Sequence, residues 1–284
     1  MRFLDNVLTD FIERAPEQFD DAKYSAEKER SVGLGVMGFH SYLQQHNIPL
    51  ESVMSKAWNK KIFKHIQEHV DQASKDLADE RGPCPDAADY GYNERFSNKT
   101  AIAPTASISI ICGGASPGVE PVAANSYTHK TLSGSFNVRN RYLVELLEKH
   151  GKNTDDVWSG ITTNQGSVSH LDFLTDLEKD VFKTAFELDQ KWIIELSGDR
   201  TPYISQAQSI NLFVPADIHK RELHKIHFDA WKKGLKSLYY CRSKSIQRAE
   251  NINDAKSTDV LANVYKNKAT KTDEPEYEEC LSCQ

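Results

Sequence analysis

Apolar residues recur at helical spacing in several segments of the chain. Between residues 62 and 77 they lie three or four positions apart, and Gly82 follows as a typical helix end. The segment 174–196 has the same spacing and predicts a longer helix that ends at Gly198. Two further predicted helices are one around residues 143–147 that ends at Gly151, and one that Asp217 caps and that ends at Gly234.

Short apolar segments bounded by turn residues lie between these helices and are typical of strands. They cover residues 32–37, 101–103, 209–214 and 237–241. Because strands that alternate with helices pair in parallel, the pattern predicts an α/β fold with a mostly parallel sheet.

The character of the sequence changes after about residue 245. Residues 251–284 are polar, and the last twelve, 273–284, contain five acidic residues and no basic one. Such a segment cannot bury enough apolar surface to offset its ordering entropy. We therefore expect a folded region, 1–245, and a disordered, flexible tail, 246–284, that ends in the pair Cys280 and Cys283.

Charge and composition narrow the class of protein. The formal net charge is -6 with both signs well mixed, which argues against a nucleic-acid binder. No run of eighteen apolar residues is present, which excludes a membrane span, and residues 1–16 lack the apolar core of a signal peptide. We expect a cytoplasmic protein without a disulfide framework, since the five cysteines are odd in number.

Three local patterns suggest chemistry but favour structural interpretations. Gly33, Gly35 and Gly38 fit a dinucleotide-binding motif, yet mostly charged residues precede them, so a glycine-rich strand in close backbone contact is favoured. His219, His224 and His227 share a predicted helix with interleaved basic residues, which indicates a solvated face rather than a metal site. Cys112 is expected to be a small buried residue.

The segment 101–114 contains the most informative pattern. An apolar strand runs into Pro104, and the hydroxyl residues Thr105 and Ser107 open a short helical pattern. The first amides of a helix have no intrahelical partner and carry partial positive charge, so small side chains there permit phosphate binding. Taken alone, these residues favour an ordinary N-cap, because Thr and Ser are common at any helix start.

Several short segments, taken in order, resemble the C-terminal barrel region of class I ribonucleotide reductase large subunits. They are RFLDN (2–6), VGLGVMG (32–38), APTAS (103–107), GVEP (118–121), LSGSF (132–136), QSIN (208–211), WKKGLKSLYY (231–240) and CLSC (280–283). The resemblance covers essentially the whole chain.

The resemblance implies the C-terminal half of a ten-stranded α/β barrel. It also implies that Met1 lies inside the barrel, so that the finger-loop cysteine that becomes a thiyl radical belongs to a companion N-terminal chain. Either the gene is split or the chain is truncated. The chain itself is expected to bind no metal or other cofactor, because a metal-containing small subunit supplies the radical in this family.

The resemblance also assigns candidate site residues. Thr105, Ala106, Ser107 and Ile108 match the loop that holds the substrate diphosphate. Tyr239 and Tyr240 match a stacked pair that relays the radical, although adjacent residues of a strand ordinarily point to opposite faces. Cys280 and Cys283 match a shuttle dithiol that thioredoxin or glutaredoxin recharges; half of a zinc site is the alternative.

Two other classes of function remain open. One is a non-catalytic remnant or regulator that binds the small subunit, and the other is a stand-alone domain that binds a phosphate ligand. The leading hypothesis is an oxidoreductase part that reduces ribonucleoside diphosphates only together with the companion chain and the small subunit.

Overall fold

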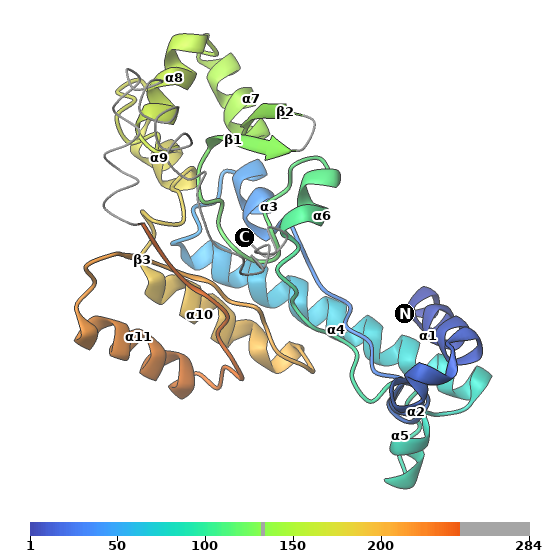
Figure 1. Ribbon diagram of the computed structural model, residues 1–284. Coiled ribbons are helices and arrows are strands. Elements are labelled where there is room, and N and C mark those ends of the chain that lie inside the picture. The colour runs from blue at the N-terminus through green and yellow to red at the C-terminus, as the bar shows by residue number, and fades with distance from the viewer. Residues whose placement is uncertain (132–133, 245–284) are drawn as a thin grey trace, which may run out of the picture.

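The computed structural model describes residues 1–131 and 134–244 (Figure 1). The helices are α1 (Arg2–Arg14), α2 (Asp20–Glu29), α3 (Phe39–Gln45), α4 (Val53–Arg81), α5 (Pro85–Asp89), α6 (Ala106–Ile111), α7 (Arg141–Lys149), α8 (Asp155–Thr163), α9 (Asp176–Val181), α10 (Gln190–Arg200) and α11 (Lys220–Lys232), with 3-10 turns η1 (Glu17–Phe19) and η2 (Thr201–Tyr203). The strands are β1 (Ser126–Thr131), β2 (Gly134–Arg139), β3 (Leu212–Pro215) and β4 (Cys241–Lys244). The predicted tail, 246–284, lies outside these residues, so the division into two regions stays a prediction.

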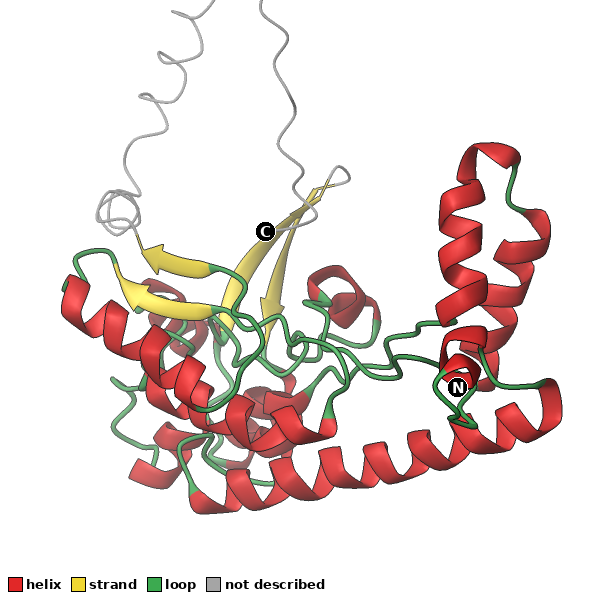
Figure 2. Cartoon of the chain, turned by 90° about the horizontal axis from the view of Figure 1, so that it is seen from below, coloured by secondary structure: helices red, strands yellow, loops and turns green. Residues whose placement is uncertain are grey.

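Helix α4 is the longest element, with 29 residues, and it connects two parts of the molecule (Figure 2). The Ser52 side chain accepts a hydrogen bond from the Ser55 backbone and caps its start. Gly82 follows its end with φ 85°, a conformation that favours glycine, so the helix end predicted there is confirmed.

Parallel pairing places the predicted strand segments side by side. Leu34 pairs with Thr100, Ile102 pairs with Gln208, and β3 pairs with β4, all in parallel. The predicted α/β arrangement with parallel strands is therefore confirmed, although the first pairings are single bridges rather than long ladders. The hairpin of β1 and β2 is antiparallel and was not among the predicted strands.

The glycine-rich segment lies in close backbone contact, as predicted. A Cβ atom added at Gly35 would lie 2.5 Å from the carbonyl oxygen of Ala101, and one at Gly33 would lie 3.1 Å from the Ala101 Cβ. Glycine is required here because the neighbouring strand approaches too closely for a side chain.

The predicted helix over 174–196 is wrong as a single element, because the chain breaks it into α9 and α10. Thr175 and Glu178 form a capping box at the start of α9, and Asp189 caps α10 separately. Between them the Ala185 amide donates to the carbonyl of Val122, 2.8 Å away in a distant loop, which no continuous helix permits. At α11 the cap is His219 rather than the predicted Asp217.

Two large apolar cores and two small ones lie among the described residues. The larger one packs α3 and α4 against α10 and the strand segments, through residues such as Phe39, Leu43, Phe63, Ile102 and Leu196. A smaller core joins α7, α8 and α9.

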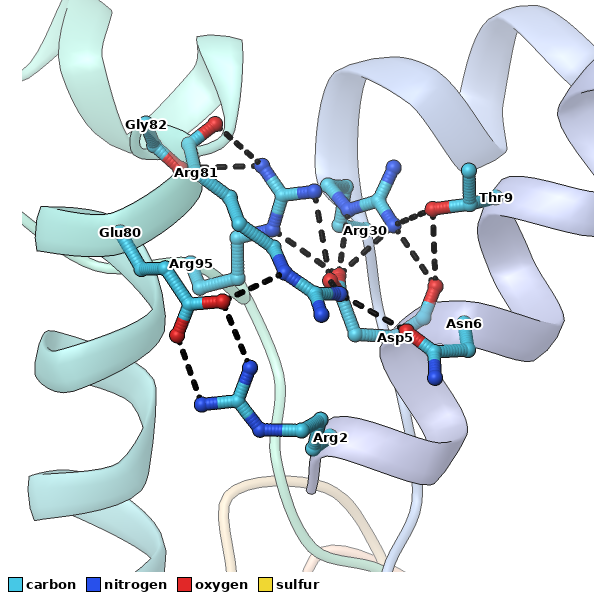
Figure 3. A network of polar contacts seen from close by, with 9 residues as sticks. All are labelled: Arg2, Asp5, Asn6, Thr9, Arg30, Glu80, Arg81, Gly82 and Arg95. Carbon is cyan, nitrogen blue, oxygen red and sulfur yellow. Dashed lines mark hydrogen bonds and ion pairs between the residues drawn. The ribbon is translucent and has the colours of Figure 1, made fainter.

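Helices α1, α2 and α5 and the far end of α4 form a helical lobe away from the strands (Figure 1). At its centre the buried Asp5 carboxylate accepts hydrogen bonds from Arg30, Arg81 and Arg95, at nitrogen-to-oxygen distances from 2.7 Å (Figure 3). Arg2 pairs with Glu80 beside it. One carboxylate therefore ties three distant chain segments together.

Candidate functional site

The segment that predicts a phosphate loop leads from a paired strand directly into α6. Thr105 precedes the helix with φ 54°, an unusual conformation for a β-branched residue. Its hydroxyl does not cap α6 but accepts a hydrogen bond from the Gly118 amide at 2.7 Å. The ordinary N-cap interpretation is thus wrong for Thr105, and no side chain caps the first-turn amides.

The side chains around these amides are small or turned away. Ala106 is partly buried, whereas Ser107 and Ile108 are exposed. Cys112, at the C-terminal end of α6, is also exposed, so the predicted burial of this residue is wrong. The physical reason is that α6 fully buries only Ser109, and its C-terminal residues Ile110 and Ile111 are exposed beside Cys112.

Tyr239 and Tyr240 lie together rather than on opposite faces. Their ring centroids are 4.1 Å apart at an interplanar angle of 55°. Both rings are about half exposed, with 45% and 43% of their surface accessible. Strand β4 begins only at Cys241, so strand alternation does not apply to the pair.

A buried carboxylate stands behind the tyrosine pair. Glu120 is 8% exposed and accepts hydrogen bonds from the side chain and backbone of Asn211. The side-chain oxygen of Asn211 in turn accepts the Tyr240 amide at 3.1 Å. The Arg242 guanidinium lies 5.7 Å from the centre of the Tyr240 ring.

Burial raises the pKa of the Glu120 carboxyl, and the Asn211 hydrogen bonds and the Arg242 charge offset this only in part. One of its two carboxylate oxygens is buried without a hydrogen-bond partner. Such an incompletely paired titratable group is typical of functional sites.

A cavity of about 310 Å³ reaches Tyr239 and Pro104, the residue directly before the loop 105–108 (the α6 loop), although no residue of that loop lines it. It is lined by residues 101–104 and 206–209 together with Ser237 and Tyr239. Pro104 directly precedes the α6 loop, so an occupant of this cavity can lie near both that loop and the tyrosine pair. The Thr105–Gly118 hydrogen bond further connects the loop to the segment that carries Glu120.

Glu120, Asn211 and Arg242 were not among the residues predicted for the site. The first two belong to the segments GVEP and QSIN, which carry the family resemblance but suggest no role by themselves. Their positions become informative only when the fold brings them to Tyr240.

Other predicted features lie elsewhere. Cys280 and Cys283 are outside the described residues. His219, His224 and His227 are exposed along α11, and among the described residues no cluster of three or more His, Cys, Asp or Glu could hold a metal ion. No helix in residues 1–131 and 134–244 is long and apolar enough to cross a membrane.

Parallel strand pairings beside a cavity that Pro104 and Tyr239 line define an α/β domain. The family model described as "Ribonucleotide reductase, barrel domain" matches residues 1–94 and 86–241. The chain belongs to this family, as its resemblance to ribonucleotide reductase large subunits predicted.

Curated relatives carry the corresponding name. The chain is 51% identical over 256 residues to the ribonucleoside-diphosphate reductase large subunit of Invertebrate iridescent virus 6, covering 89% of this chain and 26% of that protein. The protein of the same name from Invertebrate iridescent virus 3 is 44% identical, with 90% and 41% covered. The chain thus spans less than half the length of these relatives.

A solved structure agrees with the assignment to a barrel. The Actinobacillus ureae class Id ribonucleotide reductase alpha subunit is 40% identical, with a TM-score of 0.79. The match covers 87% of this chain and 46% of that one. The predicted fold, part of a reductase barrel, is therefore confirmed.

Proposed function

We propose that this chain supplies part of the catalytic barrel of a class I ribonucleoside-diphosphate reductase. The assembled enzyme reduces ribonucleoside diphosphates to deoxyribonucleoside diphosphates by radical chemistry. The observation that carries the proposal is the cavity, because Tyr239 and Pro104, the residue directly before the α6 loop, both line it.

The α6 loop holds the substrate diphosphate in this proposal. The first-turn amides are free of side-chain caps, and a helix start favours negative charge. Thr105 orients the loop through its bond from Gly118, while Ala106 and Ser107 leave room for phosphate oxygens. The exposed Ile108 faces the remaining ribonucleotide or the companion part of the barrel.

The tyrosine pair carries the radical between the small subunit and the substrate site. Passing a radical from one tyrosine to the other moves one electron and one proton, and both phenol rings must be close for this transfer. Their 4.1 Å separation meets that requirement. Glu120 and Arg242 set the electrostatic surroundings of Tyr240, from the buried and the exposed side respectively.

The other components come from the same assignment. Cys280 and Cys283 act as a shuttle dithiol that reduces the active-site disulfide and is recharged by thioredoxin or glutaredoxin. A metal-containing small subunit generates the radical. An N-terminal part of the large subunit contributes the thiyl-radical cysteine and the remaining strands.

The proposal is tested by asking whether deoxynucleotide formation requires all of these partners. The chain is mixed with an N-terminal large-subunit fragment, the small subunit and a dithiol reductant, and deoxynucleotide formation is measured. Turnover only in the complete mixture supports the proposal. Small-subunit binding without turnover would instead establish a regulator, and nucleotide binding by the chain alone without small-subunit binding would establish a phosphate-binding domain.

A further inference from the structure

Helix α11 carries an aromatic stripe on its outer surface. His224, Phe228 and Trp231 share one helix face because they lie three or four residues apart. Their rings stack in succession, with centroids 6.0 Å and 5.5 Å apart. Trp231 is 70% exposed and Phe228 is 43% exposed, so the stripe faces away from the core. A stacked apolar surface of this kind is typical of a binding face.

Basic residues surround the stripe. The Lys232 ammonium lies 4.7 Å from the centre of the Phe228 ring, and Lys220, Arg221 and Lys225 are exposed along the same helix. Residues 219–236 contain six basic and two acidic residues, whereas the whole chain has a net charge of -6. The face therefore concentrates positive charge on an acidic protein.

A separate groove of about 410 Å³ lies between α10 and α11, lined by Lys191, Ile194, Glu195, Ile226, Asp229, Lys232 and Lys233. Lys233 is paired there with Glu195 at 2.7 Å, so the charge of this groove is largely balanced. The exposed aromatic stripe and its basic border, rather than this groove, fit an extended segment that is acidic and carries an occasional aromatic group.

The chain itself contains a segment of this chemistry. Residues 273–284 hold five acidic residues and no basic one, with Tyr277 and Pro275 among them. We propose that the α11 face, the aromatic stripe with its basic border, is the docking site of this C-terminal segment. Tyr277 supplies a flat ring for Trp231, and the acidic side chains pair with the lysines and Arg221.

Chain length permits the contact. Lys244, the last described residue, pairs with Pro215 in the register of β3 and β4, and α11 starts only a few residues after Pro215. Residues 245–272 span at most about 100 Å when fully extended, whereas α11 is about 20 Å long. Because the segment is tethered, its effective concentration is high, and even a weak site is occupied.

Docking would hold Cys280 and Cys283 at α11 between reaction cycles. This consequence rests on the proposed shuttle role, but the docking itself requires neither a partner chain nor any activity. Failure of the docking experiment therefore leaves the reductase proposal untouched, and the reverse also holds.

The experiment uses a carbodiimide, which joins a carboxylate to a lysine that lies in contact with it. The full chain is treated at low salt, and cross-linked peptides are identified by mass spectrometry. We expect the tail acids to link to Lys225 and Lys232 roughly tenfold more often than to Lys64 and Lys75, equally exposed lysines of α4, and we expect high salt to remove the preference.

Two variants sharpen the result without removing any lysine. Trp231→Ala removes the exposed ring and should abolish the preference for α11, whereas Tyr24→Ala, at a site on α2 that is 65% exposed, should leave it intact. Mixing isotopically light and heavy chains separates links within one molecule from links between two.

Three outcomes would overturn the proposal. The first is cross-links spread evenly over all exposed lysines, and the second is an unchanged pattern in Trp231→Ala. The third is α11 lysines that never link to the tail and become protected only when the small subunit is added, which would assign the face to that partner.

Discussion

One buried carboxylate, Asp5, lies in the helical lobe, and another, Glu120, lies beside the tyrosine pair. Their pKa values shift in opposite directions. Burial alone would raise the pKa of Asp5, but hydrogen bonds from Arg95, Arg81 and Arg30 outweigh burial and hold that pKa below its ordinary value. Glu120 is contacted by a neutral amide instead, and burial raises its pKa.

The difference in pKa shift distinguishes a buried carboxylate that stabilises the fold from one that is suited to a functional role. Three guanidinium groups saturate Asp5 and fix helices α1, α2 and α4 to one another, which is a structural task. Glu120 keeps one oxygen without a hydrogen-bond partner and lies next to a half-exposed tyrosine pair. An incompletely paired group in such a place is suited to a change of charge state or partner during function.

The largest effect is expected when the Asp5 carboxylate, the structural member of this comparison, is neutralised. Asp5→Asn removes the charge that Arg30, Arg81 and Arg95 share, and leaves buried cations without a counterion. We expect the free energy of unfolding to fall by about 3–5 kcal/mol, measured by urea denaturation. Glu80→Gln, at a half-exposed ion pair with Arg2, is the control and should lower the free energy of unfolding far less than Asp5→Asn. An equal loss of unfolding free energy in the two variants would show that Asp5 stabilises the fold no more than an exposed ion pair does.

A smaller effect is expected at the α6 loop. Ser107→Asp places a fixed negative charge beside the amides proposed to bind the diphosphate. Substrate affinity in the assembled enzyme should weaken by about 1–3 kcal/mol, with little change in melting temperature because Ser107 is exposed. Ser107→Ala, which adds no charge, should weaken affinity less. Unchanged affinity in Ser107→Asp would exclude the loop from substrate binding.

The smallest effect is expected for Glu120, the carboxyl beside the tyrosine pair. Glu120→Gln keeps a carbonyl oxygen for the Asn211 donors, so the free energy of unfolding should change by about 1 kcal/mol or less near pH 4. In the native chain the folded state holds the Glu120 proton to higher pH than the unfolded state, whose pKa is near 4.5. Stability from this group is therefore present below pH 4.5 and lost as pH rises through the raised value.

Urea titrations at several pH values compare the two chains. The native chain should lose stability relative to Glu120→Gln as pH rises above 4.5. Parallel pH profiles would show that the Glu120 carboxyl is not perturbed by burial.

The sequence predicts the elements whose signals are local. Helix α4 follows from apolar spacing and from Gly82, and the close approach at Gly35 follows from a glycine-rich strand. The break between α9 and α10 depends on Ala185 bonding to Val122, a tertiary contact that periodicity within the segment does not contain. The apolar residues before and after the break pack into different cores, so their continuous spacing does not mark one helix face.

In the candidate site, too, some residues could be predicted from the sequence and others could not. The α6 loop and the tyrosines were found through a family resemblance, since hydroxyl residues at a helix start and adjacent tyrosines are common in ordinary structure. The sequence does not predict a role for Glu120, because its partners Asn211 and Arg242 are distant in sequence and come close to it only in the folded chain.

The most direct test of the central claim, that this region carries a radical beside the substrate, is the turnover of Tyr239→Phe and Tyr240→Phe in the assembled reductase. Each change keeps the ring and removes only the O–H group. We expect deoxynucleotide formation to fall to background, while substrate affinity and the free energy of unfolding stay near those of the native chain. Tyr90→Phe, at a site that is 82% exposed on the helical lobe, should retain full turnover. Retained turnover in both site variants would contradict the account and return the pair to a packing role.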